Sequence, residues 1–373
     1  MRLALNLILS LGMLGLCTWL VWPDAAERAD LHQVILQLRW ADFAPYLAAS
    51  IGLQATAHLC RSLRWNHLLA PLGVKVPAGP LLAMSSVGYM AILALPARLG
   101  EFVRPGLLRK AGYTTASAGL GTIAVERVVD GLIISLLVFG AFFVHQNPNS
   151  PSWMMRTAWG VLVLFSAGMI FLVFALRRPA PTVRFCLAIS LLPRFAPRLA
   201  AAIEHRMLDM IRGFSVLSDL RSLVLFVLWS LVYWIANGML MWLLAHAFGL
   251  PLSVVGAFAT MGLLGVGLML PNSPGLVGQF QWFTLLGMSL YLGFDAFDPA
   301  TKHSALYATS LAYAIAQHLF QVTWYVAMGA LGLASPWVSF HDLWTVRKAP
   351  ADAAEPRAAD AAAELPRAKV ERG

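Results

Sequence analysis

Charged residues are scarce in this chain, since only 12% of its 373 residues are Asp, Glu, Lys or Arg. A soluble domain carries about twice that share, so the composition excludes an ordinary soluble globular protein. Apolar residues make up 59% of the sequence. They gather in runs of about 20 residues, the length that crosses a bilayer core of about 30 Å. The sequence therefore predicts an all-α polytopic membrane protein.

Cysteine is also scarce, and the three that occur are Cys17, Cys60 and Cys186. They show no CxxC or other metal-ligand spacing, which argues against a disulfide framework or a zinc site. A GxGxxA match at residues 119–124 follows no strand, so dinucleotide binding is not expected. The sequence contains no basic module typical of nucleic-acid binding. We predict no catalytic residue, no metal site, no cofactor and no nucleic-acid partner.

Six apolar segments are long enough to span a bilayer: residues 3–22, 43–60, 121–144, 157–176, 222–248 and 305–333. Two further apolar segments, 77–95 and 252–294, are interrupted by Pro, Gly and Ser. The first run begins like a signal peptide, but it is too long for one and lacks a small-residue cleavage site. We therefore expect residues 1–22 to form an uncleaved N-terminal transmembrane helix.

The basic residues give the expected orientation. Segments 61–120 and 177–221 are rich in Arg and Lys and are predicted to be cytoplasmic. Because basic residues flank 77–95 on both sides, this segment should enter from the cytoplasm and return to it. By the same logic, 252–294 should enter from the outer face and return there. The pattern predicts about six spanning helices, two re-entrant helical hairpins, and both termini in the cytoplasm.

The two interruptions resemble each other in sequence. LPARLGEF, residues 95–102, follows an inward-running segment, and LPNSPGLVGQF, residues 270–280, follows an outward-running one. Similar units in opposite orientations form an inverted repeat, which in many transporters places the substrate site where broken helices meet. A chance match of short segments is the alternative. The residues predicted to break the helices are Pro96, Gly100, Pro271, Pro274 and Gly275.

Charged residues accompany the first interruption. Arg98, Glu101 and Arg104 are spaced three apart, so in a helix one carboxylate would bridge two guanidinium groups. Guanidinium groups suit phosphate oxygens, which indicates a cradle for a lipid phosphate. The alternative is that these residues are ordinary charges that flank an apolar segment on its cytoplasmic side. The predicted substrate-binding residues are Arg98, Glu101, Arg104, Arg109, Asn272 and Ser273.

A second charged group lies in the next apolar segment. Glu126 and Asp130 share one helix face, with Arg127 between them. Unpaired, each would cost about 2.5–3.5 kcal/mol at a helix centre. We therefore expect these residues to face inward and to pair with the basic residues of 98–109, as gating residues or as structural ion pairs. His318 is assigned to the same gating group, with hydrogen-bonded packing as its alternative.

Two segments outside the spans have distinct compositions. In 177–221, apolar residues recur at helical spacing and charged residues occupy the opposite face. The apolar residues are Leu199, Ile203, Met207, Met210, Ile211 and Phe214. This pattern is typical of a helix on an anionic membrane surface, with packing against cytoplasmic loops as the alternative. Residues 347–373 are rich in Ala, Pro and charge, and we expect a disordered cytoplasmic tail.

The blocks RLGEFVRP and ERVVD, followed by LPNSPGLVGQFQW and the late His318, together carry a family resemblance. They resemble the flippase-like integral membrane family named after the transmembrane region of lysylphosphatidylglycerol synthases. The resemblance covers about residues 40–335 and implies movement of lipids or lipid-linked groups between leaflets. Two departures matter: no soluble synthase domain follows, which favours a stand-alone unit, and Gln281 stands where the family often has a glutamate.

These features predict a transporter of the bacterial inner membrane that moves an anionic phospholipid or a lipid-linked saccharide between leaflets. Its expected partner is the membrane lipid itself. One alternative is a membrane-embedded transferase that acts on a lipid headgroup, with Glu101 or Asp130 as base. Another is a non-catalytic accessory subunit that serves a partner protein of an envelope-lipid or polysaccharide pathway.

Overall fold

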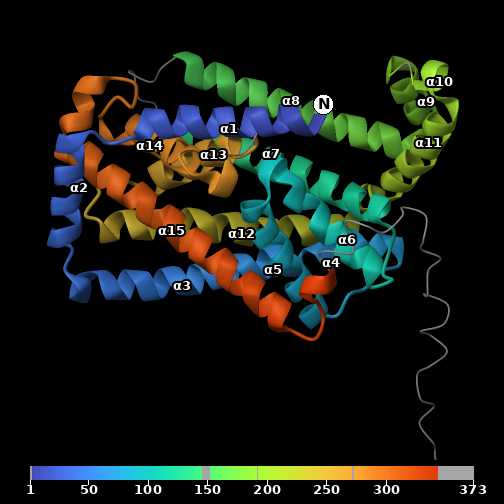
Figure 1. The fold of residues 1–373 in the computed structure, drawn as a ribbon, viewed down its shortest axis with the longest axis horizontal. Helices are drawn as coiled ribbons and strands as arrows, with labels where there is room; N and C mark the ends of the chain where they lie inside the picture. Colours follow the sequence, from blue (N-terminus) through green and yellow to red (C-terminus); the bar gives the residue numbers. More distant parts are fainter. Residues whose placement is uncertain (1, 145–151, 191, 271–272, 343–373) are drawn as a thin grey trace, which may run out of the picture.

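The computed structural model describes residues 2–144, 152–190, 192–270 and 273–342, and the side chains of all but 2–10, 26, 96–98, 142–144, 152–154, 192 and 299 among them. Every regular element in these ranges is a helix. The long helices run side by side along one direction (Figure 1). The all-α fold class predicted from the sequence is confirmed.

Six long helices coincide with the six predicted spans. They are α1 (Arg2–Val21), α3 (Trp40–Leu63), α7 (Ala116–Val144), α8 (Ser152–Arg177), α12 (Leu220–Ala247) and α15 (Ala305–Ala334). At about 1.5 Å per residue they are about 30–45 Å long, enough to cross a hydrocarbon core. By length and apolar composition, two helical stretches qualify as membrane spans, Met155–Arg177 and Leu220–Ala247.

Both interrupted segments fold as a pair of helices that double back. In the first hairpin (residues 78–110), α5 (Ala78–Ala94) leads through η2 (Pro96–Phe102), a 3-10 helix, to α6 (Val103–Lys110), which packs on α5. In the second hairpin (residues 254–292), α13 (Val254–Gly267) leads through η4 (Pro274–Leu276) to α14 (Gln279–Leu292), which packs along α13. These helices are about 12–26 Å long, shorter than a hydrocarbon core.

The two hairpins lie toward opposite ends of the bundle. Figure 1 shows the first hairpin near the end that carries α4 (Trp65–Leu69) and the second near the end that carries α2 (Ala25–Gln37). They meet inside the bundle, because η4 contacts α5 and α1 contacts both η2 and η4. The chain therefore has the two opposed breaks expected from its sequence. Which end faces the cytoplasm stays a prediction from the basic residues.

The backbone gives separate reasons for the glycine at each break. Gly275 has a φ of +62°, in the left-handed region that glycine adopts without steric cost. Gly100 instead lies so close to α5 that an added Cβ would be 2.3 Å from the Ala91 carbonyl carbon. Pro96 and Pro274 each open a 3-10 helix, where a missing N–H removes no internal hydrogen bond. Pro271 lies outside the described residues.

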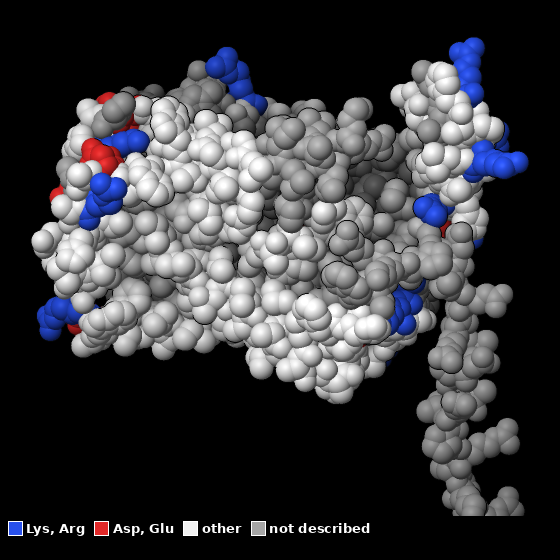
Figure 2. Space-filling view, in the orientation of Figure 1, with Lys and Arg blue, Asp and Glu red and all other residues white. Residues whose placement is uncertain are grey.

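Buried apolar side chains form two main clusters, one around each hairpin. The surface follows a different pattern along the bundle. Figure 2 shows that the coloured Lys, Arg, Asp and Glu side chains lie mostly toward the two ends of this face, with a white band between them. A bilayer around the middle of the bundle requires this distribution, because charge is costly in hydrocarbon.

Shorter helices cover the ends. The segment 177–221 forms α9 (Pro179–Ser190), α10 (Leu192–Phe195), α11 (Pro197–Arg212) and η3 (Ser215–Ser218), gathered beside the end of α8 (Figure 1). Two more 3-10 helices are η1 (Ala70–Leu72) and η5 (Pro299–His303). The amphipathic pattern predicted within 199–214 falls on α11 and ends just after it, and the rest of the segment forms separate short helices.

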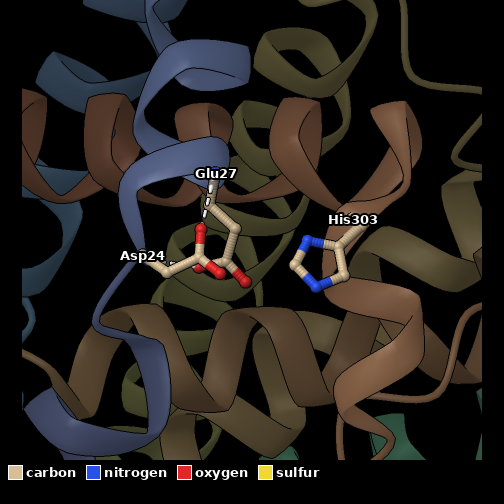
Figure 3. Close-up of side chains that lie close together, drawn as sticks. All are labelled: Asp24, Glu27 and His303. Atoms are coloured by element: carbon tan, nitrogen blue, oxygen red, sulfur yellow. Dashed lines mark hydrogen bonds between the residues drawn. The ribbon is translucent and has the colours of Figure 1, made fainter.

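A capping box begins α2 at the other end. The Glu27 N–H donates to the Asp24 carboxylate, and the Asp24 N–H donates to the Glu27 carboxylate, both at 2.8 Å (Figure 3). His303 of η5 faces these carboxylates, and ligand atoms of the three residues lie within 4.8 Å of one another. Because both carboxylates bond to the helix start, the cluster fixes the turn between α1 and α2 against the loop before α15.

Candidate functional site

A cavity of about 170 Å³ lies between the two hairpins. The first hairpin contributes Tyr89, Ile92, Leu93 and Glu101, and the second contributes Met261, Leu264, Gly265 and Leu276. The remaining walls come from α3, α7, α12 and α15. A volume of this size holds roughly ten water molecules by the space that one water needs. Both broken segments therefore open onto one shared space.

Arg61 of α3 lines this cavity. Its guanidinium donates to the Tyr325 hydroxyl at 3.1 Å and lies 4.1 Å from the centre of the Tyr89 ring. The Tyr233 ring lies 5.7 Å away. Among the described residues, no carboxylate lies within ion-pair distance of Arg61, and its Nε has no hydrogen-bond partner. The Tyr325 hydroxyl and aromatic faces stabilise this cation without a carboxylate, so it can still bind an anion.

Arg64, three residues further along, is in contrast paired with a carboxylate, although its Nε also has no hydrogen-bond partner among the described residues. Its two terminal nitrogens donate to the two Asp130 oxygens at 2.8 and 2.7 Å, in the fork geometry of a strong ion pair. Arg64 also donates to the Ser230 hydroxyl at 2.7 Å, and the Trp234 indole donates to Asp130 at 3.1 Å. Arg64 has no exposed surface. The Arg64–Asp130 pair, with Ser230 and Trp234, therefore connects the end of α3 to α7 and α12 beside the cavity.

Glu126 of α7 is the second buried carboxylate. It accepts hydrogen bonds from Arg104 at 3.1 Å, Arg127 at 3.3 Å and Arg64 at 3.5 Å. The Arg104 guanidinium also lies 4.1 Å over the Trp65 ring. Arg127 reaches in the other direction to Glu101 of η2 at 3.8 Å. Glu126 thereby attaches α6 to α7, while Glu101 connects the first break to the same helix.

The charges of this network do not balance. It contains four guanidinium groups and three carboxylates, namely Arg61, Arg64, Arg104, Arg127, Glu101, Glu126 and Asp130. These described side chains carry an excess of one positive charge. Because the other three arginines each contact a carboxylate, the excess is located at Arg61. A low-dielectric cavity with such a cation attracts an anion.

The second hairpin is held by a chain of neutral hydrogen bonds. The Gly278 N–H donates to the Gln281 side-chain oxygen at 2.9 Å, which leaves the Gln281 amide nitrogen to donate to His318 Nδ1 at 2.8 Å. His318 Nε2 then donates to the Gly275 carbonyl at 2.9 Å. This order requires the neutral imidazole with its proton on Nε2. The ring stacks on Phe280.

Five of the predicted residues, Glu101, Arg104, Glu126, Arg127 and Asp130, meet in one network. Glu101, Arg127 and Asp130 line the cavity, and Glu126 lies directly behind them. The expected pairing is found for Glu126, which binds Arg104, but Asp130 binds Arg64 rather than a basic residue of 98–109. The reason is that Arg64 caps the end of α3, which packs closely on α12 and brings the guanidinium to α7.

Other predicted residues lie elsewhere. Arg104 binds Glu126 rather than Glu101, because η2 is a 3-10 helix and α6 turns toward α7. The described lining of the cavity does not include Arg104, Arg109, Ser273 or His318. Ser273 instead closes the second break, with its hydroxyl donating to the Val277 carbonyl at 2.9 Å.

Two predicted substrate-binding residues, Arg98 and Asn272, are not fully covered by the described residues. The backbone of Arg98 is part of η2, but its side chain is outside the described set. Asn272 lies outside the described residues altogether. Their roles stay predictions from the sequence.

The sequence interpretation missed Arg61 and Arg64 as site residues. It counted them as flanking charges, because the predicted span ended at Cys60. The helix in fact continues through Leu63, so Arg61 lies on the spanning helix and Arg64 caps its end. The available signal was their spacing of three residues directly after an apolar helix, which places two guanidinium groups on one face.

The curated relatives are distant and longer than the matched region. The UPF0104 membrane protein MJ1078 of Methanocaldococcus jannaschii is 33% identical over 81 residues, which is 21% of this chain and 34% of that protein. Glycosyltransferase AglD of Haloferax volcanii is 23% identical over 313 residues, which is 77% of this chain and 49% of that protein. The chain thus spans about half or less of each relative. No solved structure matches it significantly.

The family assignment rests on a match along most of the chain. The sequence profile described as the transmembrane region of lysylphosphatidylglycerol synthase matches residues 4–329. This range contains both hairpins and every residue of the charged network. With the long apolar helices, it establishes a helical membrane protein. The chain belongs to the lysylphosphatidylglycerol synthase transmembrane-region family.

Proposed function

We propose that this protein is a lipid transporter that moves an anionic phospholipid or a lipid-linked saccharide between the leaflets of its membrane. The observation that carries this proposal is the cavity walled by two oppositely directed broken hairpins, with an arginine that lacks a carboxylate partner. Broken helices that meet at a shared polar site are the common architecture of secondary transporters. Membership of a lipid-linked membrane family supports the same conclusion.

Arg61 binds the phosphate of the lipid in this proposal. A single excess positive charge suits a phosphodiester, which carries one negative charge. The surrounding tyrosine rings and the side chains of Asn237 and Gln321 offer hydrogen bonds and flat surfaces for a glycerol or sugar headgroup. Met261 and Leu264 of the second hairpin provide the apolar part of the wall.

The Glu101–Arg127 pair gates the cavity in this proposal. Its atoms are 3.8 Å apart and its side chains are 19% and 27% exposed, whereas the Arg64–Asp130 pair is tightly bonded and buried. A partly exposed ion pair is weak enough to open when a phosphate approaches Arg127. Opening it releases η2 from α7. Arg64, Glu126 and Asp130 stay fixed and hold the framework.

We further propose that the protein resides in the bacterial inner membrane, with both termini and the mouth of the first hairpin in the cytoplasm. The basic residues support this orientation, since Lys and Arg prefer cytoplasmic loops. Arg98 and Arg109 then lie at the cytoplasmic end of the first hairpin, where the sequence analysis assigned them to substrate binding. Asn272 and Ser273 belong to the outer break.

Lipid scrambling in proteoliposomes tests the proposal. Purified protein is reconstituted with NBD-labelled phosphatidylglycerol, and dithionite reports how much label reaches the outer leaflet. We expect Arg61→Gln to slow translocation about tenfold or more, because a charge-assisted hydrogen bond is lost. Arg221→Gln, at an exposed position on α12, serves as the matched control and should keep the wild-type rate. Equal rates in protein-containing and empty vesicles contradict the proposal.

The same vesicles test the alternative function, transfer of a group to a lipid headgroup. The name of the Haloferax relative, a glycosyltransferase, suggests this alternative. Mass spectrometry of the lipids after incubation with nucleotide-activated and lipid-linked sugar donors detects any new covalent product. A new product without translocation favours the transferase. Neither activity in the purified protein favours the accessory-subunit alternative.

A further inference from the structure

Helices α9–α11, residues 179–212, form a platform with large apolar side chains on its surface. Phe185 is 64% exposed, Ile189 67%, Phe195 81% and Leu199 52%. Phe185 and Ile189 are four residues apart and therefore share one face of α9. Apolar side chains of this size, gathered in one small unit, mark an interaction surface.

Arginines surround these apolar side chains. The exposed ones in and beside the platform are Arg178, Arg184, Arg194, Arg198, Arg206 and Arg212. The two carboxylates of the same stretch have contacts of their own: Asp209 accepts from Thr115 and pairs with Arg212, and Glu204 lines a shallow depression with Arg184 and Arg194. The platform therefore has a strong positive excess, and Figure 2 shows Lys or Arg side chains on this corner of the molecule.

The platform sits directly at the end of a membrane-spanning helix. α8 ends at Arg177 and α9 begins at Pro179, so a single residue separates them. The window of α8 that qualifies as a span is only 11% buried within the protein, so lipid surrounds this helix. Figure 1 shows α9 and α10 reaching sideways beyond the end of α8. This geometry places their exposed side chains at the level of the lipid headgroups.

The back of the platform is fixed to the bundle. An added Cβ on Gly121 of α7 would be 2.0 Å from the Met210 carbonyl oxygen, so α11 and α7 are in backbone contact. Ile211 and Phe214 are buried at 5% and 2% exposure. Five of the six apolar residues of the face predicted from the sequence therefore pack inside the protein, and Leu199 alone among them is exposed. The surface that remains free belongs to α9, α10 and the start of α11.

We propose that the platform docks on the anionic headgroups of the leaflet in which α8 ends. Phe185, Ile189 and Phe195 insert among the lipids, and the arginines bind their phosphates. The occupant is a lipid surface because the platform continues from a lipid-exposed span and carries the opposite charge. This docking does not depend on the transport proposed above. It fixes the position of α7, which carries Glu126 and Asp130, relative to the membrane surface.

Depth-dependent quenching tests this docking. A full-length variant lacking Cys17, Cys60 and Cys186 receives one cysteine at Phe195, labelled with NBD, in phosphatidylcholine vesicles with or without phosphatidylglycerol. We expect quenching by lipid-attached nitroxide, protection from aqueous iodide, and about twofold stronger nitroxide quenching with phosphatidylglycerol. A label at Ala111, exposed at the end of α6, is the matched control and should respond to iodide.

A charge variant completes the test. Arg184→Gln, Arg194→Gln and Arg198→Gln together should remove the effect of phosphatidylglycerol on the Phe195 label. Iodide quenching at Phe195 without nitroxide quenching overturns the proposal. Protection from both quenchers also overturns it, because protein would then cover this surface. An undiminished phosphatidylglycerol effect in the charge variant rejects the anionic headgroups as the partner.

Discussion

The two hairpins solve the same physical problem with different chemistry. Each contains a broken helix inside the bundle, where unsatisfied backbone groups are costly. The first is fixed to its neighbours by charge, through Arg104 to Glu126 and Glu101 to Arg127. In the second, a chain of neutral groups from Gln281 through His318 satisfies the carbonyl of Gly275. The two hairpins thus enter the bundle from opposite ends, but ion pairs hold the first and neutral hydrogen bonds hold the second.

This difference assigns separate roles to the two halves of the cavity. Charge gathers on the side of the first hairpin, where Arg61, Glu101 and Arg127 lie. The second hairpin contributes apolar wall and a left-handed turn, with Leu276 at a φ of +61° beside Gly275. A non-glycine residue in this region stores strain, which is common where a segment moves. In the proposed transport the charged side holds the anion, and each break has a feature suited to movement, namely the weak Glu101–Arg127 pair at the first and the strained Leu276 at the second.

Removing the central carboxylate should have the largest effect on the charged side. Glu126→Gln leaves Arg104 buried without its carboxylate, which costs about 3–5 kcal/mol in comparable buried pairs, while Arg127 is partly exposed and keeps Glu101. We expect a loss of this size in the free energy of unfolding, measured by SDS titration in mixed micelles. Asp42→Asn is the control, because its ion pair with Arg39 is exposed and contributes about 1 kcal/mol or less.

A double variant separates charge balance from packing at this position. Glu126→Gln combined with Arg104→Gln removes one charge of each sign, so it should be clearly less destabilised than the sum of the two single variants. Additive losses would show that the charged side is not held by this ion pair, and the contrast between the hairpins would then disappear.

The neutral side should respond less. His318→Phe preserves the stack on Phe280 but leaves the Gly275 carbonyl and the Gln281 amide without their partner. Unsatisfied neutral groups cost about 1–3 kcal/mol, so the loss should fall below that of Glu126→Gln in the same titration. Gln317→Leu is the matched control on the same helix. The Gln317 amide is buried without a hydrogen-bond partner among the described residues, so this change should be neutral or stabilising.

The spans and the breaks were predictable because they depend on local composition. An apolar run of about 20 residues, or a cluster such as LPNSPG, determines the backbone through hydropathy and through the φ limits of proline and glycine. The six long helices accordingly coincide with the predicted spans. The loop charges add which end of the bundle is cytoplasmic, and that assignment stays a prediction.

The partners in the site were not predictable, because they depend on how distant helices pack. Asp130 binds Arg64, which is 66 residues away in sequence, and Arg61 meets Tyr325 across 264 residues. A single sequence shows the charges but not which ones share a cavity. The pair of Arg104 with Glu126 was among the expected ones, because both residues belong to charged groups that adjoin in sequence.

The smallest effect of a substitution is expected at the outer ends of the hairpins, where each hairpin meets the surface of the bundle. At the first, Lys110 of α6 binds Asp342, in a segment whose Trp337 packs against Gly79. Burial opposes ionisation of Asp342, but hydrogen bonds from Lys110 and Ser339 outweigh it, so the pKa of Asp342 lies below its ordinary value. At the second mouth, Lys302 donates to the Leu20 backbone carbonyl, which does not titrate.

A depressed pKa in the folded state means that the Asp342 contribution is complete above the ordinary carboxyl pKa of about 3.9 and is lost as the pH falls through the lower folded value. At neutral pH, Asp342→Asn should therefore speed hydrogen exchange of residues 335–342 by about fivefold or less, the size expected of a half-exposed pair. The wild-type and variant rates should converge only once the pH is below the folded pKa of Asp342, which lies under its ordinary value. Exchange around Lys302 should be the same in both proteins at every pH. A difference at residues 335–342 that persists in acid would show that the segment is held by the packing of Trp337, and that charge acts only inside the first hairpin and not at its mouth.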